Sequence, residues 1–120
     1  MRYEAAGTEN AELTCVAYGT CARVALGAKK LAEQEGFRLG VFRPITLWPF
    51  PSEGLGAIAE TGKPVLTVEM SLGQLVEDVK LAVLGKGPVH LLGHSGGVIP
   101  TEEEVFAEAK RIIMERRRIA

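Results

Sequence analysis

The sequence predicts an α/β fold of three layers, in which helices cover both faces of a mostly parallel sheet of four to five strands. After a polar lead of about ten residues, short β-rich runs alternate with longer helical patterns, as expected of βα units. Residues 12–18, ELTCVAY, form a nearly continuous apolar run, which is typical of a strand buried on both faces. The 120 residues, 47 % of them hydrophobic, suffice for one domain that needs no metal or disulfide to hold its core.

The first βα unit is expected over residues 12–36. Gly19 and Thr20 follow the strand, and Thr20 is the predicted N-cap of the next helix. Gly36 is placed to end that helix. Its buried stripe is predicted to comprise Cys21, Val24, Ala25, Ala28, Leu31 and Ala32.

The middle of the chain contains a segment that can neither continue a strand nor form an ordinary helix. Residues 39–42 are predicted to form the second parallel strand, and residues 43–51, RPITLWPFP, then bring three prolines and the only tryptophan together. A short helix is expected after Ser52, although Gly54 and Gly56 make it marginal. Its inward side chains are predicted to be Leu55, Ile58 and Ala59.

The second half of the chain repeats the alternation. Residues 64–70 and 89–92 are predicted strands, separated by a helix that ends near Gly85. Thr101 and Glu104 have the spacing of a capping box and predict the start of the last helix. The buried stripes of these two helices are predicted to be Leu72, Val76, Val79 and Val83 for the first, and Val105, Ala109, Ile112 and Ile113 for the second.

The chain is therefore interpreted as a lead segment or edge strand over residues 1–10 and a single domain over residues 11–120. The basic run 116–118 lies in the last helical turn, where cations suit the helix dipole, and is expected to be a solvated helix end. The acids at 102–104 are read as charges that complement the dipole at the start of that helix.

Charge and hydropathy exclude several classes of partner. Fourteen Lys and Arg against fifteen Asp and Glu give a net charge of −1, so no field is present that would recruit nucleic acid or a membrane surface. The N-terminus has no apolar signal region, and no window approaches the roughly eighteen apolar residues of a spanning helix. A cytoplasmic protein is expected.

Two cysteines, Cys15 and Cys21, are too few for an iron–sulfur cluster and lack the CxxC spacing of a zinc knuckle. Both are expected to be reduced thiols. Cys21 would lie in the first turn of a helix, where the dipole lowers a thiol pKa, so a reactive Cys21 stays open.

The loops that follow parallel strands meet at the carboxyl edge of the sheet, where such folds place ligands and contacts. The four loops are residues 19–20, 43–51, 70–74 and 93–100. Gly19 and Thr20 open a helix and are a weak candidate for anion binding. Glu69 ends a buried strand and needs a partner, which is either another part of the protein or the amides at the start of the next helix.

The segment GHSGG, residues 93–97, satisfies the G-x-S-x-G pattern of a hydrolase nucleophile elbow but lacks the context. A helix should begin at Ser95, whereas the next one is predicted at Thr101. The catalytic histidine should follow the serine, yet His90 and His94 both precede it. The segment is better explained as a glycine-rich turn, and a serine hydrolase is a remote alternative.

Four segments taken together resemble, in order and spacing, the C-terminal region of the α subunit of 2-oxoacid:ferredoxin oxidoreductases. They are VAYGTCARVA (16–25), GVFRPITLWPFP (40–51), VLTVEMSLGQLVEDVKLAV (65–83) and GHSGGVIPTEEEV (93–105). The LWPFP form is most similar to the 2-oxoglutarate type. The resemblance implies a fold like the transketolase C-terminal domain, with an antiparallel edge strand that residues 2–5 would supply.

Such an enzyme decarboxylates a 2-oxo acid on thiamine diphosphate, passes electrons through iron–sulfur clusters to ferredoxin and releases an acyl-coenzyme A. The resemblance implies that the diphosphate–magnesium site lies in the β subunit, and that the acid activating the cofactor lies in an N-terminal domain. The chain is therefore expected to be an assembly domain that binds no cofactor and is inactive alone. Its expected partners are the N-terminal domain of the same subunit and the β subunit, with ferredoxin and coenzyme A contacting only the whole enzyme.

The resemblance gives the proline-rich segment a function as a rigid scaffold that presents side chains to a partner. The predicted interface residues are Arg43, Pro44, Trp48, Phe50, Glu69 and Gln74. The alternative is that Trp48 and Phe50 cover the sheet edge within the domain itself.

Three departures from the family pattern concern the loops. Cys21 stands where threonine or serine is expected, Ser71 where asparagine is usual, and His94-Ser95 where arginine-proline is common. A free-standing α/β domain that binds a small molecule or an anion at Gly19-Thr20 remains the main alternative function.

Overall fold

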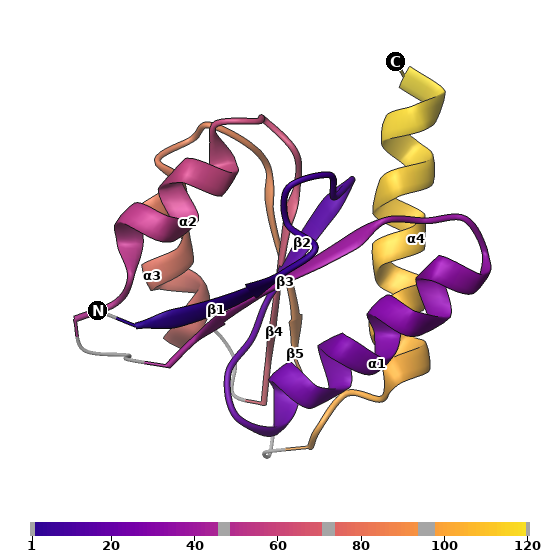
Figure 1. Cartoon of the computed structure of the whole chain (residues 1–120), viewed down its shortest axis with the longest axis horizontal. Helices are drawn as coiled ribbons and strands as arrows, with labels where there is room; N and C mark the ends of the chain where they lie inside the picture. Colours follow the sequence, from indigo (N-terminus) through magenta and orange to yellow (C-terminus); the bar gives the residue numbers. More distant parts are fainter. Residues whose placement is uncertain (1, 46–48, 71–73, 94–97, 120) are drawn as a thin grey trace.

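The computed structural model describes residues 2–45, 49–70, 74–93 and 98–119, and for Gln74 the backbone only. Within these residues the chain forms a five-stranded sheet between two helical layers, as predicted. Helices α1 and α4 pack together on one face of the sheet, and α2 and α3 pack together on the other (Figure 1).

The order of strands in the sheet is β1-β3-β2-β4-β5. The strands are β1 Tyr3–Ala6, β2 Leu13–Val16, β3 Leu39–Pro44, β4 Val65–Glu69 and β5 Val89–Gly93. Strand β1 pairs antiparallel with β3, and all other neighbouring pairs are parallel. The edge strand that the family resemblance implied is therefore present, and β3 extends two residues further than the sequence pattern indicated.

The helices are α1 Thr20–Gln34, α2 Ser52–Ala59, α3 Gln74–Val83 and α4 Glu102–Ile119. The prediction that Thr20 caps α1 is wrong: the N-cap is Gly19, no side chain caps the helix, and Thr20 is its first residue. Gly19 has a φ of 60°, a left-handed conformation that glycine adopts without steric cost. Gly36, with a φ of 82°, follows the end of α1 as predicted.

Helix α4 begins with the predicted capping box. The amide of Thr101 donates to Glu104 Oε1 at 2.9 Å, and the amide of Glu104 donates to Thr101 Oγ1 at 3.0 Å. These two bonds satisfy donors that the first helical turn would otherwise leave free.

The far end of α4 is more than the solvated end that the sequence suggested. Arg117 donates to both carboxylate oxygens of Glu12, at 2.7 and 2.8 Å, and its guanidinium carbon lies 4.7 Å from the ring centroid of Phe37. The hydrogen bond from Arg117 is the main cause that lowers the pKa of Glu12. This clasp joins the last helix to the residue before β2, so the basic run is partly structural.

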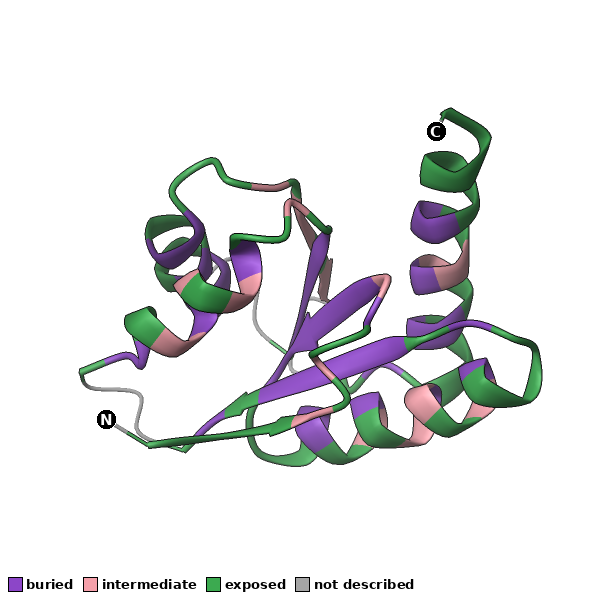
Figure 2. Cartoon of the chain, turned by 45° about the horizontal axis from the view of Figure 1, so that its top comes forward, coloured by how far each residue is buried: buried purple, intermediate pink, exposed green. Residues whose placement is uncertain are grey.

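The core consists of two layers, one on each side of the sheet, because side chains alternate along the strands. Figure 2 shows that the buried residues lie along the central strands and on parts of the helices. On β4, Leu66 and Val68 face α1 and α4. Their neighbour Val65 points to the opposite side of the sheet and faces α2 and α3. All residues of β2 and β4 are buried, as the apolar runs predicted, while edge strand β5 is only partly buried.

The predicted helical stripes are largely confirmed. In α1 the alanines and Cys21 are buried, and Val24 and Leu31 pack against the same core while remaining partly exposed. Val76, Val79 and Val83 are buried in α3, and Leu72 lies outside the described residues. In α4 the four predicted residues are buried, together with Phe106, which the stripe did not include.

A glycine that weakens α2 locally makes room for β1. A Cβ added at Gly54 would lie 2.7 Å from atoms of the Tyr3 ring. Helix α2 can therefore pass directly beneath this ring only because position 54 has no side chain.

Candidate functional site

The candidate site lies at the carboxyl edge of the sheet, between β2 and β4. Strand β2 leads into α1 on one face, whereas β4 leads into α3 on the opposite face, so the chain direction diverges between these neighbouring strands. Such a divergence opens a crevice in α/β sheets and is where these folds place ligands. A cleft of about 390 Å³ lies here, lined by Tyr18, Gly19, Thr20, Cys21, Val68, Glu69 and Met70. Three residues selected from the sequence, Gly19, Thr20 and Glu69, therefore come together.

Glu69 is the most buried acid among the described residues, with 3 % of its surface exposed. Its two carboxylate oxygens accept hydrogen bonds from the amides of Leu75 and Val76, at 3.0 and 3.1 Å. These amides belong to the first turn of α3, where the helix dipole also favours a negative charge. Glu69 therefore fastens the end of β4 to the start of α3, which is the local function that the sequence left open.

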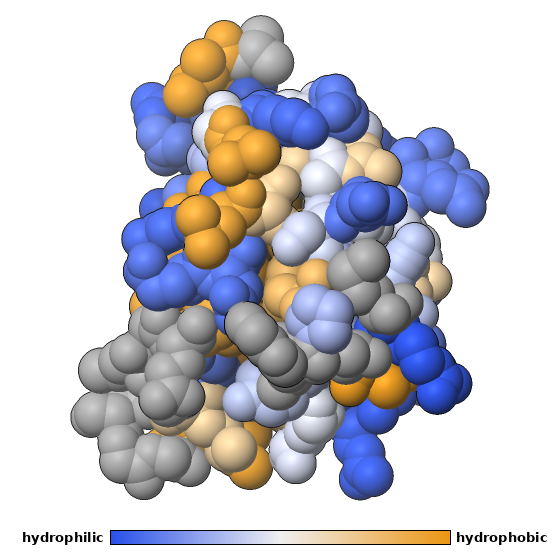
Figure 3. Space-filling model, turned by 90° about the vertical axis from the view of Figure 1, so that its left-hand side faces the viewer, coloured by the Kyte–Doolittle hydropathy of each residue, from blue (hydrophilic) through white to orange (hydrophobic). Residues whose placement is uncertain are grey.

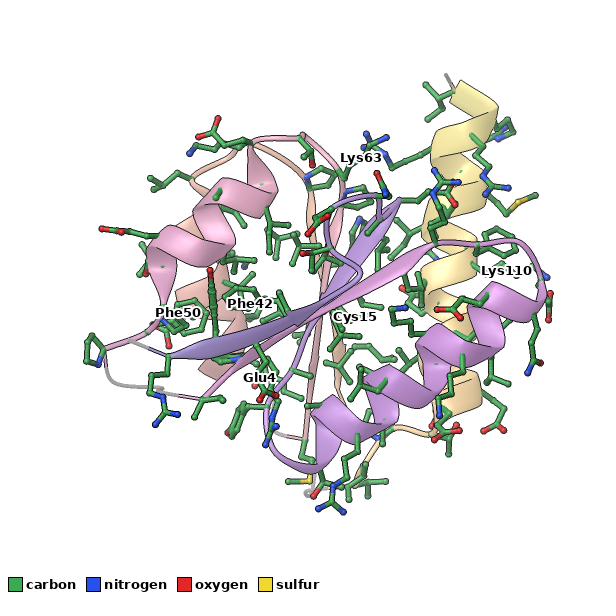
Figure 4. All side chains as sticks on the ribbon, in the orientation of Figure 1. Glu4, Cys15, Phe42, Phe50, Lys63 and Lys110 are labelled. Atoms are coloured by element: carbon green, nitrogen blue, oxygen red, sulfur yellow. The ribbon has the colours of Figure 1, made fainter. Side chains whose placement is uncertain are left out.

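Neither thiol has the environment of a nucleophile. Cys21 lies in the first turn of α1, but burial raises its thiol pKa and the charge of Glu69 raises it further. The expectation that the helix dipole lowers this pKa is wrong, because desolvation and the neighbouring carboxylate outweigh it. Cys15 lies within β2 at the centre of the sheet (Figure 4), and burial raises its pKa to about 12. Both thiols are free and buried.

The start of α1 offers backbone amides without a side-chain cap. An anion at Gly19 and Thr20 would nevertheless come close to Glu69, whose charge acts on the adjacent Cys21. Like charges in a partly buried cleft repel each other, so Glu69 disfavours the anion site considered from the sequence.

The first residues of the proline-rich segment are part of the sheet. Arg43 lies on β3 directly opposite Glu4 on β1, and Arg43 Nη1 lies 3.0 Å from Glu4 Oε1. Pro44 is the last residue of β3 and is buried. This pair of charges ties the antiparallel edge strand to its neighbour, at a position where both side chains remain largely exposed.

The end of the segment belongs to the core. Phe50 is 8 % exposed and lies with Phe42 and Leu55 in the core layer under α2 and α3 (Figure 4). This placement matches the alternative in which the segment covers the sheet within the domain. Trp48 lies outside the described residues, and the side chain of Gln74, the first residue of α3, is not described either.

The six predicted interface residues therefore do not form one described surface. Arg43 and Pro44 lie on β3, Phe50 lies in the core, and Glu69 lies beneath α3. Sequence reasoning missed Tyr18 and Met70, which border the cleft and are 40 % and 39 % exposed. Met70 directly follows β4 and Tyr18 lies two residues after β2, and this position at the carboxyl edge is the signal that could have identified them.

The described residues around the serine motif do not meet the requirements of a nucleophile elbow. His94 and Ser95 lie outside the described residues, and α4 begins only at Glu102. His90 lies on β5, where burial and then the charge of Arg111 on α4 lower its pKa. The helix that should start at the serine is absent from residues 98–101.

The described residues contain no group of three or more His, Cys, Asp or Glu that could hold a metal ion. In the same part of the chain no helix is long and apolar enough to cross a membrane.

Comparison with known proteins identifies the family. A family model described as pyruvate:ferredoxin oxidoreductase core domain II matches residues 11–105. The chain belongs to this family.

Among curated proteins, the chain is similar to ketoisovalerate oxidoreductase subunit VorB of Methanothermobacter marburgensis. The two are 41 % identical over 96 % of this chain and 32 % of the relative. It is also 39 % identical to 2-oxoglutarate synthase subunit KorA of Methanothermobacter thermautotrophicus, over 82 % of this chain and 26 % of the relative. The chain thus spans about a third of the length of the curated relatives it matches.

Solved structures support the same family. A 2-oxoglutarate:ferredoxin oxidoreductase from Magnetococcus marinus, solved with 2-oxoglutarate, coenzyme A and succinyl-CoA bound, superposes with a TM-score of 0.79 at 25 % identity. The match covers 94 % of this chain and 20 % of that chain. A split-gene transketolase superposes with a TM-score of 0.76 at 23 % identity, over 92 % of this chain and 41 % of that chain, which shows the fold alone. Both the resemblance and the fold predicted from the sequence are confirmed.

The residues of this core domain II do not fit the groups that the family resemblance implies. An iron–sulfur cluster is held by cysteine thiolates, usually four, whereas the chain has two cysteines and burial raises the thiol pKa of both. Magnesium bound to a diphosphate prefers oxygen ligands such as carboxylates, and the described residues bring no three His, Cys, Asp or Glu side chains together that could hold the ion.

Proposed function

We propose that the chain is an assembly domain in the α subunit of a thiamine-diphosphate-dependent 2-oxoacid:ferredoxin oxidoreductase. Such an enzyme converts a 2-oxo acid, coenzyme A and oxidised ferredoxin to an acyl-coenzyme A, CO₂ and reduced ferredoxin. The family match over residues 11–105 carries this proposal. The domain supports the enzyme structurally, and the catalytic groups lie in other domains.

The chemistry of the described residues supports a structural function. The carboxylate of Glu69 accepts hydrogen bonds from two amides of α3. The thiols of Cys15 and Cys21 are buried, and burial raises their pKa values. At the cleft, the carboxylate of Glu69 is therefore engaged in holding β4 to α3, and the thiol of Cys21 is poorly suited to act as a nucleophile.

The relatives named above act on ketoisovalerate and on 2-oxoglutarate, so the proposed substrate class is a small 2-oxo acid. The LWPFP form favours 2-oxoglutarate. We expect the N-terminal domain of the same subunit and the β subunit to contact the carboxyl edge, and the enzyme to be cytoplasmic.

The test compares the isolated chain with the complete oxidoreductase. Calorimetric titration of the isolated chain with thiamine diphosphate and Mg²⁺ should show no binding, and the chain should not oxidise any 2-oxo acid. The complete enzyme should lose activity when residues 11–120 are deleted, because its subunits no longer assemble. Micromolar binding of thiamine diphosphate by the isolated chain would contradict the proposal.

The cleft between β2 and β4 favours one second candidate, a domain that binds a small molecule. Thermal melts of the chain with phosphate and with acyl-coenzyme A test it, because a ligand that binds the folded state raises the melting temperature. Melting curves that do not move with either ligand would eliminate this candidate.

A further inference from the structure

A small basic pocket lies at the amino edge of the sheet, at the opposite end of the strands from the candidate site. It has a volume of about 140 Å³ and is lined by Glu12, Lys63, Ile113, Arg116 and Arg117. Glu12 directly precedes β2 and Lys63 lies on the loop that leads into β4, whereas the other three residues belong to α4 (Figure 4). Three segments that are far apart in the sequence therefore meet at this pocket.

The lining of the pocket has a surplus of positive charge. It holds three cations and one acid, and so has two more positive than negative charges, whereas the whole chain has a net charge of −1. The carboxylate of Glu12 is already engaged, because Arg117 donates to both of its oxygens, and only 13 % of the Glu12 side chain is exposed. This acid therefore offers little repulsion to an anion that enters the pocket.

Two of the cations have no acid of their own. Among the described residues, no carboxylate forms an ion pair with Lys63 or Arg116, and Arg116 Nη2 donates to the carbonyl oxygen of Gly62 at 3.4 Å, beside Lys63. Many other cations are paired. On the α2–α3 side, where hydrophilic and hydrophobic side chains are interspersed (Figure 3), Lys86 Nζ lies 2.7 Å from Glu60 Oε1. Cations held together without an acid repel each other, and a bound anion would remove that repulsion.

Arg117 completes the pocket with donors that Glu12 does not use. Its Nε and Nη2 donate to Glu12, and Nη2 also donates to the carbonyl oxygen of Gly36 at 3.4 Å. The two hydrogens of Nη1 therefore remain for another acceptor. Ile113 is only 1 % exposed and closes the inner side of the pocket. Guanidinium and ammonium donors around an apolar floor suit a compact oxyanion.

We propose that this pocket binds a phosphate group, either as free phosphate or as the monoester at the end of a larger molecule. A phosphate monoester carries about 1.5 to 2 negative charges near pH 7, which matches the surplus of two, whereas a carboxylate would leave one cation uncompensated. The pocket is smaller than the roughly 300–1,000 Å³ of a site that encloses a whole ligand, so the rest of a larger molecule would stay outside. The site goes beyond the assembly function proposed above and does not depend on it.

Nuclear magnetic resonance titration of the ¹⁵N-labelled chain with inorganic phosphate tests the site at low ionic strength, where exposed charges are least screened. The amide resonances of residues 62–63 and 113–117 should shift and saturate, and chloride at equal ionic strength should not reproduce the shifts. Adenosine monophosphate is the second probe. Tighter binding of this monoester than of phosphate would identify the end of a larger molecule as the ligand, and weaker or equal binding would identify free phosphate. Either result supports the pocket.

Variants of the exposed cations assign the binding to the pocket. Lys63→Ala and Arg116→Ala should each raise the dissociation constant of phosphate at least about threefold, because each removes a charged donor. Lys63→Arg keeps the charge and should retain most of the affinity. Lys80→Ala, at an exposed lysine of α3 on the other face of the sheet, is the matched control and should leave the constant unchanged. The same spectra verify that each variant is folded.

Three results would overturn the proposal: shifts that do not saturate, shifts that chloride reproduces, and an affinity that Lys80→Ala lowers as much as Lys63→Ala. Saturating shifts confined to Gly19 and Thr20 would place the phosphate in the cleft between β2 and β4 and would overturn it as well. The double variant with Lys63→Ala and Arg116→Ala separates this site from the functions proposed above. Binding of thiamine diphosphate, or a melting shift with phosphate, that persists in the double variant concerns those functions and not this pocket.

Discussion

The ring of Tyr3 on β1 stacks on the ring of Phe42 on β3, with centroids 4.7 Å apart and planes inclined by 20°. Phe42 is fully buried, whereas Tyr3 is 44 % exposed, so one ring of the pair covers the other from solvent. The antiparallel edge strand thus closes the core layer that lies under α2 and α3. Phe50 completes this layer at the other end of the proline-rich segment.

Phe50→Ala should reduce the free energy of unfolding of the isolated chain by about 3–5 kcal/mol, because it leaves a cavity in a packed layer. Urea unfolding measures this loss. Tyr18→Ala, at an exposed residue of the same carboxyl edge, serves as the control and should cost much less. A Phe50 variant as stable as the wild type would mean that the ring is available to a partner.

Trp48→Ala is the corresponding test of the interface prediction made from the sequence. If Trp48 contacts another subunit, the change should leave the stability of the isolated chain nearly unchanged and weaken assembly by about 2 kcal/mol or more. Urea unfolding of the chain and a binding titration with the partner subunit measure the two effects. A loss of several kcal/mol in the isolated chain would show that Trp48 is core.

Gly40→Ala should destabilise the chain by about 1–3 kcal/mol, because overpacking forces the backbone to move. A Cβ at this position of β3 would lie 2.9 Å from the backbone Cα of Thr8. Gly27→Ala is the matched control: the nearest atoms to its Cβ would be the carboxylate and Cγ of the exposed Glu102 side chain, which can rotate away. In α1 this second change should be neutral or stabilise by up to about 1 kcal/mol.

Glu69→Gln should lower the free energy of unfolding by about 1–3 kcal/mol, because one amide of α3 loses its acceptor. It should also lower the pKa of Cys21, since the carboxylate disfavours the thiolate. The rate of alkylation of Cys21 against pH, followed by mass spectrometry, measures that change. Glu53→Gln, at an exposed acid of α2, should alter neither quantity.

The clasp between Glu12 and Arg117 should make stability depend on pH in the acidic range. The folded-state pKa of Glu12 lies below its ordinary value of 4.5, so the clasp contributes stability above that pH and loses it as the pH falls through the folded value. Arg117→Gln should therefore destabilise the chain at pH 7 and much less near pH 3. Arg118→Gln, which breaks an exposed pair with Glu115 one turn away, is the control. An equal effect of Arg117→Gln at both pH values would refute the assignment.

The sequence predicted those parts of the fold that depend on local patterns. The apolar run of β2 reflects a strand buried on both faces, and the apolar stripe of α1 reflects a helix buried on one face. Both elements are present as predicted. The capping box of α4 was identified because its two residues are close in sequence. The N-cap of α1 was misplaced by one residue, since a left-handed glycine, and not a side chain, begins that helix.

The candidate site was less predictable, because its geometry depends on which strands are neighbours. Glu69 was identified from its position after a buried strand, but its two amide partners depend on the placement of α3. Phe50 could not be assigned between core and interface, since both environments favour an aromatic residue. Arg43 was expected at a loop, yet the extension of β3 places it opposite Glu4.

The pairing of Glu12 with Arg117 spans 105 residues of sequence. During synthesis on a ribosome, the first central strand emerges long before the arginine that secures it, and the tunnel still holds the end of α4 when the other elements are free. Final closure of the domain must therefore wait for one of the last turns of the last helix to emerge. Until then, the apolar face beneath α4 is open to chaperones and to other nascent chains.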